Sequence, residues 1–210
     1  MLPMTILTLD QISTYPTRTQ EQQLKMSLLA EYYETYLFHH FYDFKLSNGV
    51  TVRVDFHKEN FCHLIGIDQI AEKHFPTGDR KLFMHKGPGG FKRAKSGKLE
   101  FSYLKNLHQD EYNYQEQKFY FFHFIHTMLE SGNLKLVSYS AIPGSAITCD
   151  FMFHETFDNA LLHLGVEKSS KRKSFFPKTF FSRYLSDNDP SKYVDGQTEV
   201  TIVSLTKVPR

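Results

Sequence analysis

The stretch AITCDFMFHETFDNALLHLGVEK, residues 146–168, decides the fold class because it reads as two extended segments joined by a turn. The alternating hydrophobic pattern indicates two β-strands, AITCDFMFHE and ALLHLGVEK. The segments LKLVSYS, residues 134–140, and TEVTIVSLTKV, residues 198–208, have the same extended character. We therefore expect an antiparallel sheet of about four strands in the C-terminal half of the chain.

Helical periodicity dominates the chain before residue 134. Apolar residues recur at helical spacing in residues 18–42, in KENFCHLIGI from residue 58 toward His74, and in residues 109–130. Between the first two helices, residues 43–56 contain Asn48-Gly49, which favours a hairpin turn, and then an alternating strand. Helices followed by consecutive strands predict an α+β fold, with the N-terminal helix and the hairpin added to its core.

A basic segment lies between the second and third of these helices. Residues 79–98 contain seven lysines and arginines against one aspartate, with GPGG in the middle. The glycines and the proline disfavour a regular element, so we expect a loop. A glycine cluster can cradle phosphate, although the string matches neither GxxxxGK[ST] nor GxGxxG; a solvated loop is the alternative.

Composition bounds the class of protein. The chain has 210 residues, 40% of them hydrophobic, with 20 Phe, 12 Tyr and a net charge of +2, which is typical of a globular protein. No apolar run approaches the roughly 18 residues that a membrane span requires, and the N-terminus does not resemble a signal peptide. We expect a cytoplasmic protein with no membrane partner, two free thiols at Cys62 and Cys149, and neither a metal nor another cofactor.

The segment VEKSSKRKSFFPKTFFSRY, residues 166–184, combines cations with aromatic rings. Its six basic residues stand against Glu167, and five phenylalanines and tyrosines are interleaved with them. Cations neutralise phosphates and aromatic faces stack on unpaired bases, so the pattern has what binding of single-stranded nucleic acid requires. The alternative is a sheet edge protected by lysines, with its phenylalanines in the core.

Two strings in the chain are unusual, FCHLIG at residues 61–66 and PKTFF at residues 177–181. Together with Lys192-Tyr193, Gln197 and the closing strand, they resemble the fourth phage-associated family of the Barnase, EndoU, colicin and RelE-like nucleases. The resemblance covers roughly residues 43–75 and 130–208. It implies N-terminal helices packed on a four-stranded antiparallel sheet and a metal-independent ribonuclease of a phage or mobile element. It also divides the chain into a helical extension, residues 1–42, and a nuclease-like domain, residues 43–210, with a helical insertion near 91–130.

The resemblance also implies roles for individual residues. His63 becomes the candidate acid or base, Thr179 a hydroxyl donor to phosphate and Lys178 the nearby charge. From its position alone, His63 lies at a core edge, where a histidine either makes a structural hydrogen bond or transfers protons. RNA is the expected partner, with a cognate inhibitor protein as a second partner. The expected nucleic-acid contacts come from the basic segment: Lys168, Lys171, Arg172, Lys173 and Arg183.

Two further readings of the sequence stay open. His154 and His163 flank the expected turn at residues 156–159 and could meet across it as a two-histidine acid–base pair; the alternative is a pair of exposed strand residues. For the whole protein, the alternative to a ribonuclease is a non-catalytic module that binds nucleic acid or a protein partner.

Overall fold

The computed structural model describes residues 5–210, which form two compact units. The helical unit comprises the described residues up to Tyr36 together with Lys58–His123. The sheet unit comprises Leu37–His57 and Phe124–Arg210. The chain therefore crosses between the units three times. The expected division at residue 42, into an extension and a nuclease-like domain, stays a prediction.

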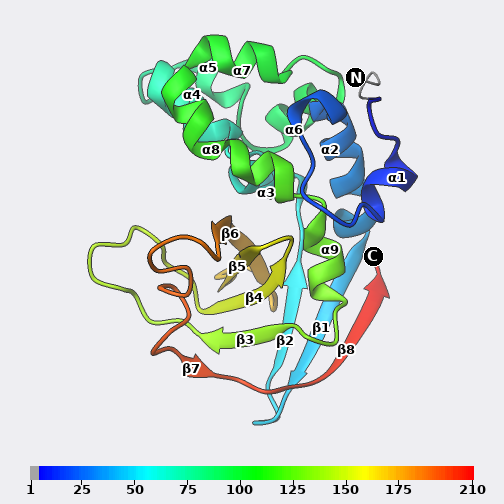
Figure 1. Ribbon diagram of the computed structural model, residues 1–210, viewed down its shortest axis with the longest axis vertical. Coiled ribbons are helices and arrows are strands. Elements are labelled where there is room, and N and C mark those ends of the chain that lie inside the picture. Colours follow the sequence, from blue (N-terminus) through cyan, green and yellow to red (C-terminus); the bar gives the residue numbers. More distant parts are fainter. Residues whose placement is uncertain (1–4) are drawn as a thin grey trace. The chain divides into compact units, whose positions relative to one another are not determined.

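The helical unit is built from short helices (Figure 1). Most are of two to three turns, and the longest, α8, follows the acidic start that the sequence indicated. The elements that lie in this unit are α1 (Leu9–Ser13), η1 (Glu21–Gln23), α2 (Met26–Tyr32), α3 (Lys58–Ile65), α4 (Ile67–His74), α5 (Arg80–Phe83), α6 (Gly87–Lys95), α7 (Phe101–Leu107) and α8 (Gln109–Phe121). A π-helical segment, η2 (Tyr33–Phe38), continues α2.

Three expected helix positions need correction. The helix expected at residues 18–42 is limited to α2 and η2, because the chain enters strand β1 (His40–Leu46) directly afterwards. The helix expected from residue 58 to His74 is broken at Gly66, whose φ of 92° is left-handed and ends α3. The loop expected at residues 79–98 contains α5 and α6, so that expectation was wrong.

The GPGG string forms the first turn of α6 for two physical reasons. Pro88 is tolerated there because the N–H that it lacks has no intrahelical acceptor in a first turn. Gly90 packs so closely that a Cβ would lie 2.7 Å from both the Cys62 Sγ and the His85 carbonyl carbon. Tertiary packing therefore outweighs the low helix propensity of glycine.

Aromatic rings form the core of the helical unit. Phe61 from α3 lies between Tyr33 and Phe91, with ring centroids 5.3 and 5.4 Å away. Phe122, which follows α8, contacts the same ring at 5.7 Å. All four rings are buried, and their edge-to-face arrangement adds stability beyond burial alone.

The sheet unit contains one eight-stranded sheet in the order β7-β3-β4-β5-β6-β2-β1-β8. An α+β fold is confirmed, but the expected count of about four strands was too low. The strands not yet bounded are β2 (Thr51–Asp55), β3 (Lys135–Ser138), β4 (Phe151–Phe157), β5 (Ala160–Lys168), β6 (Phe175–Tyr184), β7 (Thr198–Glu199) and β8 (Ile202–Pro209). Their pairings are antiparallel, except that β2 and β6 pair in parallel through Val54 and Phe175.

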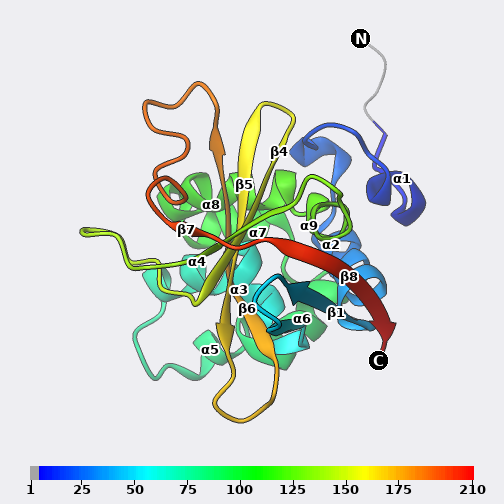
Figure 2. The ribbon, with the colours of Figure 1, turned by 90° about the horizontal axis from the view of Figure 1, so that it is seen from below.

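The sheet curls so that its two edge strands follow one another in the chain. β7 pairs with β3 at one edge and β8 pairs with β1 at the other, with only Val200 and Thr201 between them. Figures 1 and 2 show β7 running on into β8. The N–H of Val200 donates to Leu136 and the N–H of Ser47 donates to Thr201, so both edges are held at this crossing.

Local turn chemistry explains the two hairpins. Gly49 has a φ of 83° in the β1–β2 turn, as the Asn-Gly pair predicted. Asp158 and Asn159 have φ values of 43° and 59°, and they join β4 to β5 directly after the Phe157–Ala160 pair. Two positive φ values are the requirement of a tight hairpin, and Asp and Asn tolerate them.

The FFPKTFF segment lies in β6, which pairs with β5 along its length and with β2 only through Val54 and Phe175. The alternative of a lysine-protected sheet edge with phenylalanines in the core therefore stays open. Phe180 is fully buried, whereas Phe175 is half-buried. Pro177 lies at a bulge, where the register shifts between Gly165 and Val166, and this explains how a residue without an N–H fits this strand.

The core of the sheet unit lies against α9 (Phe124–Leu129) and between strands. Phe124 stacks on Phe157 with ring centroids 4.7 Å apart, and Phe44 of β1 contacts Phe153 of β4 at the same distance. The helix expected at residues 109–130 is thus confirmed as α8 and α9, although the chain bends between them at Phe122 and His123.

Candidate functional site

His63 has an exposed side chain that is held by the carboxylate of Asp68. Its side chain is 48% exposed at the end of α3, and its Nδ1 lies 2.9 Å from the Asp68 Oδ2. The Gln69 amide lies at the same distance. A carboxylate can only accept a hydrogen bond, so Nδ1 bonds Asp68 when it carries the proton, whereas the Gln69 amide can donate to Nδ1 only in the other tautomer. In the tautomer that bonds Asp68, Nε2 is the basic nitrogen.

The break at Gly66 brings this pair together. Its left-handed φ turns the chain, so that Asp68 in the first turn of α4 approaches a histidine five residues earlier. Gly66 also packs against α8, because a Cβ there would lie 2.9 Å from the Gln115 Cβ. Asp68 is buried and further fixed by the Gln69 N–H, which donates to its Oδ1.

Lys118 of α8 adds an unusual amine beside Asp68. Burial lowers the pKa of Lys118 to about 8, while the charges of Asp68 and Glu111 partly oppose the shift. A lysine with a lowered pKa next to a histidine–aspartate pair is a group whose protonation changes near neutrality. The helical unit therefore pairs one exposed imidazole with one buried carboxylate, and the charge of that carboxylate also acts on Lys118.

Thr179 and Lys178 are brought together at the bulge of β6. The Thr179 methyl lies close to Gly165, where a Cβ would be 2.7 Å from the Thr179 Cγ2 and 3.0 Å from the Cys149 Sγ. Lys178 forms an ion pair with Glu167 of β5. Their contacts lie in the sheet unit, whereas those of His63 lie in the helical unit, and the proposed catalytic roles of all three stay predictions.

Four of the five expected nucleic-acid contacts gather on one hairpin. Lys168 ends β5, and Lys171, Arg172 and Lys173 lie in the turn before β6, exposed to solvent. The Ser169 hydroxyl shapes this turn by accepting hydrogen bonds from the N–H groups of Lys171 and Arg172. Arg183 is not part of this basic hairpin, because it lies near the other end of β6, where it pairs with Asp187 at 3.2 Å.

The sequence reading missed His57, which follows β2. The buried Asp55 carboxylate lies 2.8 Å from its Nε2 and also binds Arg210, whose guanidinium donates to the Phe56 carbonyl. Burial lowers the pKa of His57, the positive charges of Arg172 and Arg210 lower it further, and Asp55 opposes them. An acid and a histidine two residues apart at a strand end share one face, and that spacing was the available signal.

His154 and His163 pair directly across β4 and β5, with ring centroids 6.5 Å apart. The expected approach is confirmed, but the alternative of exposed strand residues was wrong. His163 is fully buried and stacks on Phe181 at 4.4 Å, and burial lowers its pKa to about 3. His163 therefore stays neutral near pH 7, so the pair lacks a second titrating imidazole.

His154 lines a pocket of about 470 Å³ in the sheet unit. Burial lowers the pKa of His154, the neighbouring Lys135 lowers it further, and Glu199 and Asp195 oppose the shift. Lys135 faces His154 across β3 and β4. Acidic side chains of this pocket outnumber basic ones, which distinguishes it from the basic hairpin.

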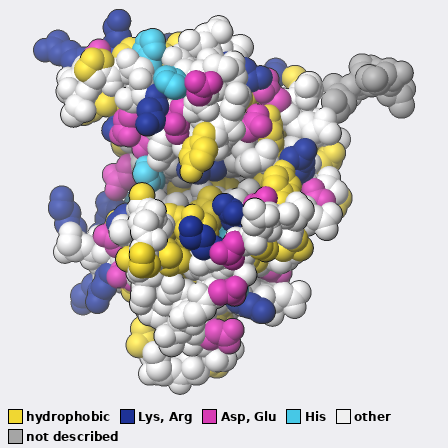
Figure 3. Space-filling view, turned by 60° about the vertical axis from the view of Figure 1, so that its left-hand side comes forward, with side chains coloured by type: hydrophobic (Ala, Val, Ile, Leu, Met, Phe, Trp, Pro, Cys, Tyr) yellow, Lys and Arg dark blue, Asp and Glu magenta, His cyan; other side chains and the backbone are white. Residues whose placement is uncertain are grey.

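Charged side chains are interspersed on the face seen in Figure 3, in keeping with the small net charge. Both cysteines are free, as expected, and burial raises the pKa of each thiol, that of Cys149 to about 12. Within residues 5–210, no helix has the length and apolarity to cross a membrane. The same residues contain no group of three His, Cys, Asp or Glu side chains placed to hold a metal ion.

These features define an α+β protein that carries several partnered histidines and an exposed basic hairpin. The chain belongs to the phage-Barnase-EndoU-ColicinE5/D-RelE like nuclease4 family, whose model matches residues 25–207. The resemblance that the FCHLIG and PKTFF strings indicated is thereby confirmed. No curated protein and no solved structure gives a significant match.

Proposed function

We propose that the protein is a ribonuclease that cleaves RNA by side-chain acid–base catalysis, with His63 as a proton-transfer group. The observation that carries this proposal is the anchored imidazole: exposed, oriented by the buried Asp68, and with Nε2 as its basic nitrogen. Membership of a nuclease family supports the reaction class. The free cysteines suit a reducing cytoplasm, and a phage or mobile element is the proposed source.

Cleavage of RNA without a metal needs three things from side chains. A base takes the 2′-hydroxyl proton, cations or hydrogen-bond donors stabilise the phosphorane, and an acid protonates the leaving 5′-oxygen. Neutral His63 serves the first step through Nε2, and Asp68 stabilises the imidazolium that forms. Thr179 and Lys178 are the proposed phosphate ligands, following the family motif.

The basic hairpin supplies the proposed contacts to the RNA backbone. Its cations, Lys168, Lys171, Arg172 and Lys173, project from a turn without an acidic residue, so they attract phosphates of any sequence. The same hairpin favours the second candidate function, a non-catalytic RNA-binding module. A cognate inhibitor protein would be the partner of an active enzyme.

The test is cleavage of total RNA by the purified protein in the presence of EDTA. His63→Gln should lower the rate at saturating substrate roughly 100-fold or more, because general acid–base groups contribute about that much. The neutral limb of the pH–rate profile should disappear with the imidazole. Asp68→Asn should retain the base but lose its orientation and should therefore lower the rate as well.

The matched control is His74→Gln, which removes another exposed histidine of the helical unit. It should keep the rate of the original protein. Because His63 is half-exposed, His63→Gln should leave the melting temperature nearly unchanged. A His63→Gln protein that cleaves at full rate would retire the catalytic role. A wild-type protein that binds RNA but never cleaves it would favour the binding module.

A further inference from the structure

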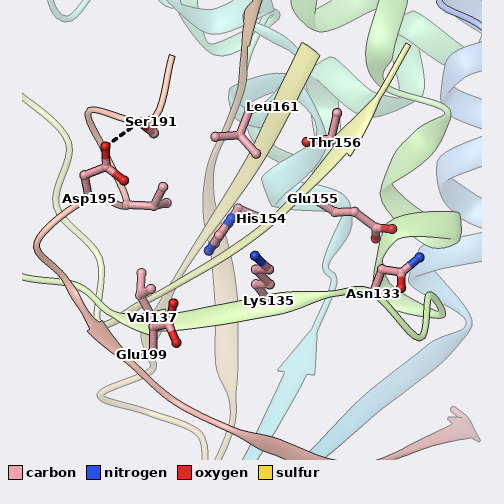
Figure 4. A pocket seen from close by; sticks show the side chains of 11 residues that line it. Asn133, Lys135, Val137, His154, Glu155, Thr156, Leu161, Ser191, Asp195 and Glu199 are labelled. Carbon is pink, nitrogen blue, oxygen red and sulfur yellow. Dashed lines mark hydrogen bonds between the residues drawn. The ribbon is translucent and has the colours of Figure 1, made fainter. Parts of the chain in front are cut away.

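The pocket at His154 has more hydrogen-bond acceptors than donors (Figure 4). His154 is only 9% exposed, its ring is directed into the pocket, and its nitrogens bind no other residue among those described. Its ring nitrogens reach the open pocket, where no described side chain uses their hydrogen-bonding capacity. A neutral imidazole has one acceptor nitrogen, so His154 can accept a hydrogen bond from a ligand there.

The charge around His154 limits the kind of ligand that fits. Asp195 and Glu199 carry carboxylates on this side of the pocket, against the ammonium of Lys135. Glu155 points toward Asn133 and accepts a hydrogen bond from the Ser131 hydroxyl. Asp195 binds the Ser191 hydroxyl with one oxygen, and Glu199 has no ion-pair partner in the described part of the chain. A phosphate would be repelled by this surplus of negative charge. A cation would be attracted, at a place distinct from the basic hairpin.

The size of the site points to an extended cation. A pocket of about 470 Å³ lies in the range of small-molecule sites and far exceeds a single ion. Val137, Leu161 and Val194 line it as well, and they offer apolar surface to an aliphatic stem. A guanidinium has five donors in a planar fork and pairs with carboxylates in two-point contacts, which suits acceptors spread around a cavity.

We propose that this pocket binds a guanidinium group on a short aliphatic chain. Glu199 and Asp195 receive the charge, and His154 accepts one further N–H. Two sources share this chemistry, a free small molecule and an arginine side chain of a peptide. The proposal does not depend on RNA cleavage.

The test follows the imidazole signals of His154 by NMR in the full-length isotopically labelled protein. Agmatine represents the free ligand, and acetyl-Gly-Arg-Gly-amide represents the peptide side chain. Both should shift the His154 signals in a saturable way at millimolar concentration. The matched peptide with citrulline in place of arginine keeps the shape without the charge and should bind at least about fivefold more weakly.

Variants locate the binding site. Glu199→Gln and Asp195→Asn should each weaken agmatine binding about fivefold, and the double variant more, because each removes one charge facing the ligand. Asp189→Asn, in the same connection but outside the pocket lining, should bind as the original protein does. Stronger binding of agmatine would indicate a free metabolite, and stronger binding of the peptide would indicate a protein partner.

Equal affinity for the arginine and citrulline peptides would overturn the proposal, and this comparison needs no variant to fold. So would binding that is unaffected in the Glu199→Gln, Asp195→Asn double variant. RNA cleavage is measured separately with His63→Gln. Failure of the ribonuclease proposal therefore does not affect the test of guanidinium binding, and failure of guanidinium binding does not affect the test of RNA cleavage.

Discussion

Alanine substitutions at Gly89 and Gly90 should change stability in opposite directions, although the two residues are neighbours in α6. A Cβ at Gly90 would lie 2.7 Å from the Cys62 Sγ, 2.7 Å from the His85 carbonyl carbon and 3.0 Å from its oxygen. Two of these three atoms belong to backbone and cannot rotate away. A Cβ at Gly89 would meet only the Phe83 carbonyl oxygen at 3.6 Å, an ordinary contact.

The magnitudes follow from two opposing effects. Replacing a helical glycine by alanine gains roughly 0.5–1 kcal/mol at either position. Overpacking a filled site costs about 1–3 kcal/mol, and the rigid neighbours of Gly90 put it toward the upper end. We expect Gly90→Ala to lose about 1–2 kcal/mol of stability and Gly89→Ala to gain up to about 1 kcal/mol.

Thermal unfolding followed by circular dichroism measures both variants. For a chain of this size, 1 kcal/mol corresponds to a shift of roughly 2–4 °C in melting temperature. Gly90→Ala should therefore melt about 2–8 °C lower than the original protein, and Gly89→Ala the same or up to about 4 °C higher. If the melting temperatures of both variants shift by the same amount in the same direction, close packing of α6 on α3 does not explain the glycine at position 90.

Three further predictions concern the sheet unit. Phe180→Ala should destabilise the protein by about 3–5 kcal/mol because the ring is fully buried, and Thr179→Ala should cost much less. Equal losses of stability in chemical denaturation would show that Thr179 is a structural residue. Replacing Lys171, Arg172 and Lys173 with Gln should weaken RNA binding. The slope of the logarithm of the binding constant against the logarithm of salt concentration should fall by up to about one unit per lost contact. An unchanged slope in a salt titration would show that the hairpin does not contact the RNA. The pKa of His163 is about 3 in the folded protein and near 6.5 in the unfolded chain. As the pH falls, the unfolded chain therefore takes up the proton first. The free energy of unfolding should decline between these two pH values by up to about 1.4 kcal/mol per pH unit. His163→Leu should show a shallower decline in urea unfolding over this range, and an identical pH dependence would contradict the assignment.

Features set by neighbouring residues were predictable from the sequence. The Asn48-Gly49 turn, the β4–β5 hairpin and the burial of Phe180 follow from turn chemistry and period-two patterning. These depend on a few residues at a time. The family resemblance likewise rested on two short strings, and it is confirmed over most of the chain.

Features that depend on distant residues were not predictable. Glycine and proline favour a loop in GPGG by themselves, and only the contact of Gly90 with Cys62 and His85 explains a helix there. Similarly, nothing local reveals that β2 pairs with β6 at Phe175. Both features depend on contacts that the sequence does not display.

The candidate site divides in the same way. Periodicity placed His63 at the edge of a core, and its side chain is 48% exposed beside buried neighbours, as that position implies. The contact with Asp68 depends on the turn at Gly66, which the pattern did not show. For His57, the Asp-Phe-His spacing was visible in the sequence, but its link to Arg210 was not.

The two edge strands, β7 and β8, are consecutive in the chain, and this arrangement constrains how the protein folds. β1 lies near residue 40, yet one of its two neighbours, β8, ends near residue 209. Pairing of such remote segments is slow, because the intervening chain must be ordered before the contact is made. During synthesis, β1 must therefore wait with an unpaired edge until β8, which ends at Pro209, has left the ribosome. A delay late in translation would prolong exposure of that edge, and the yield of folded protein should depend on chaperones that shield it.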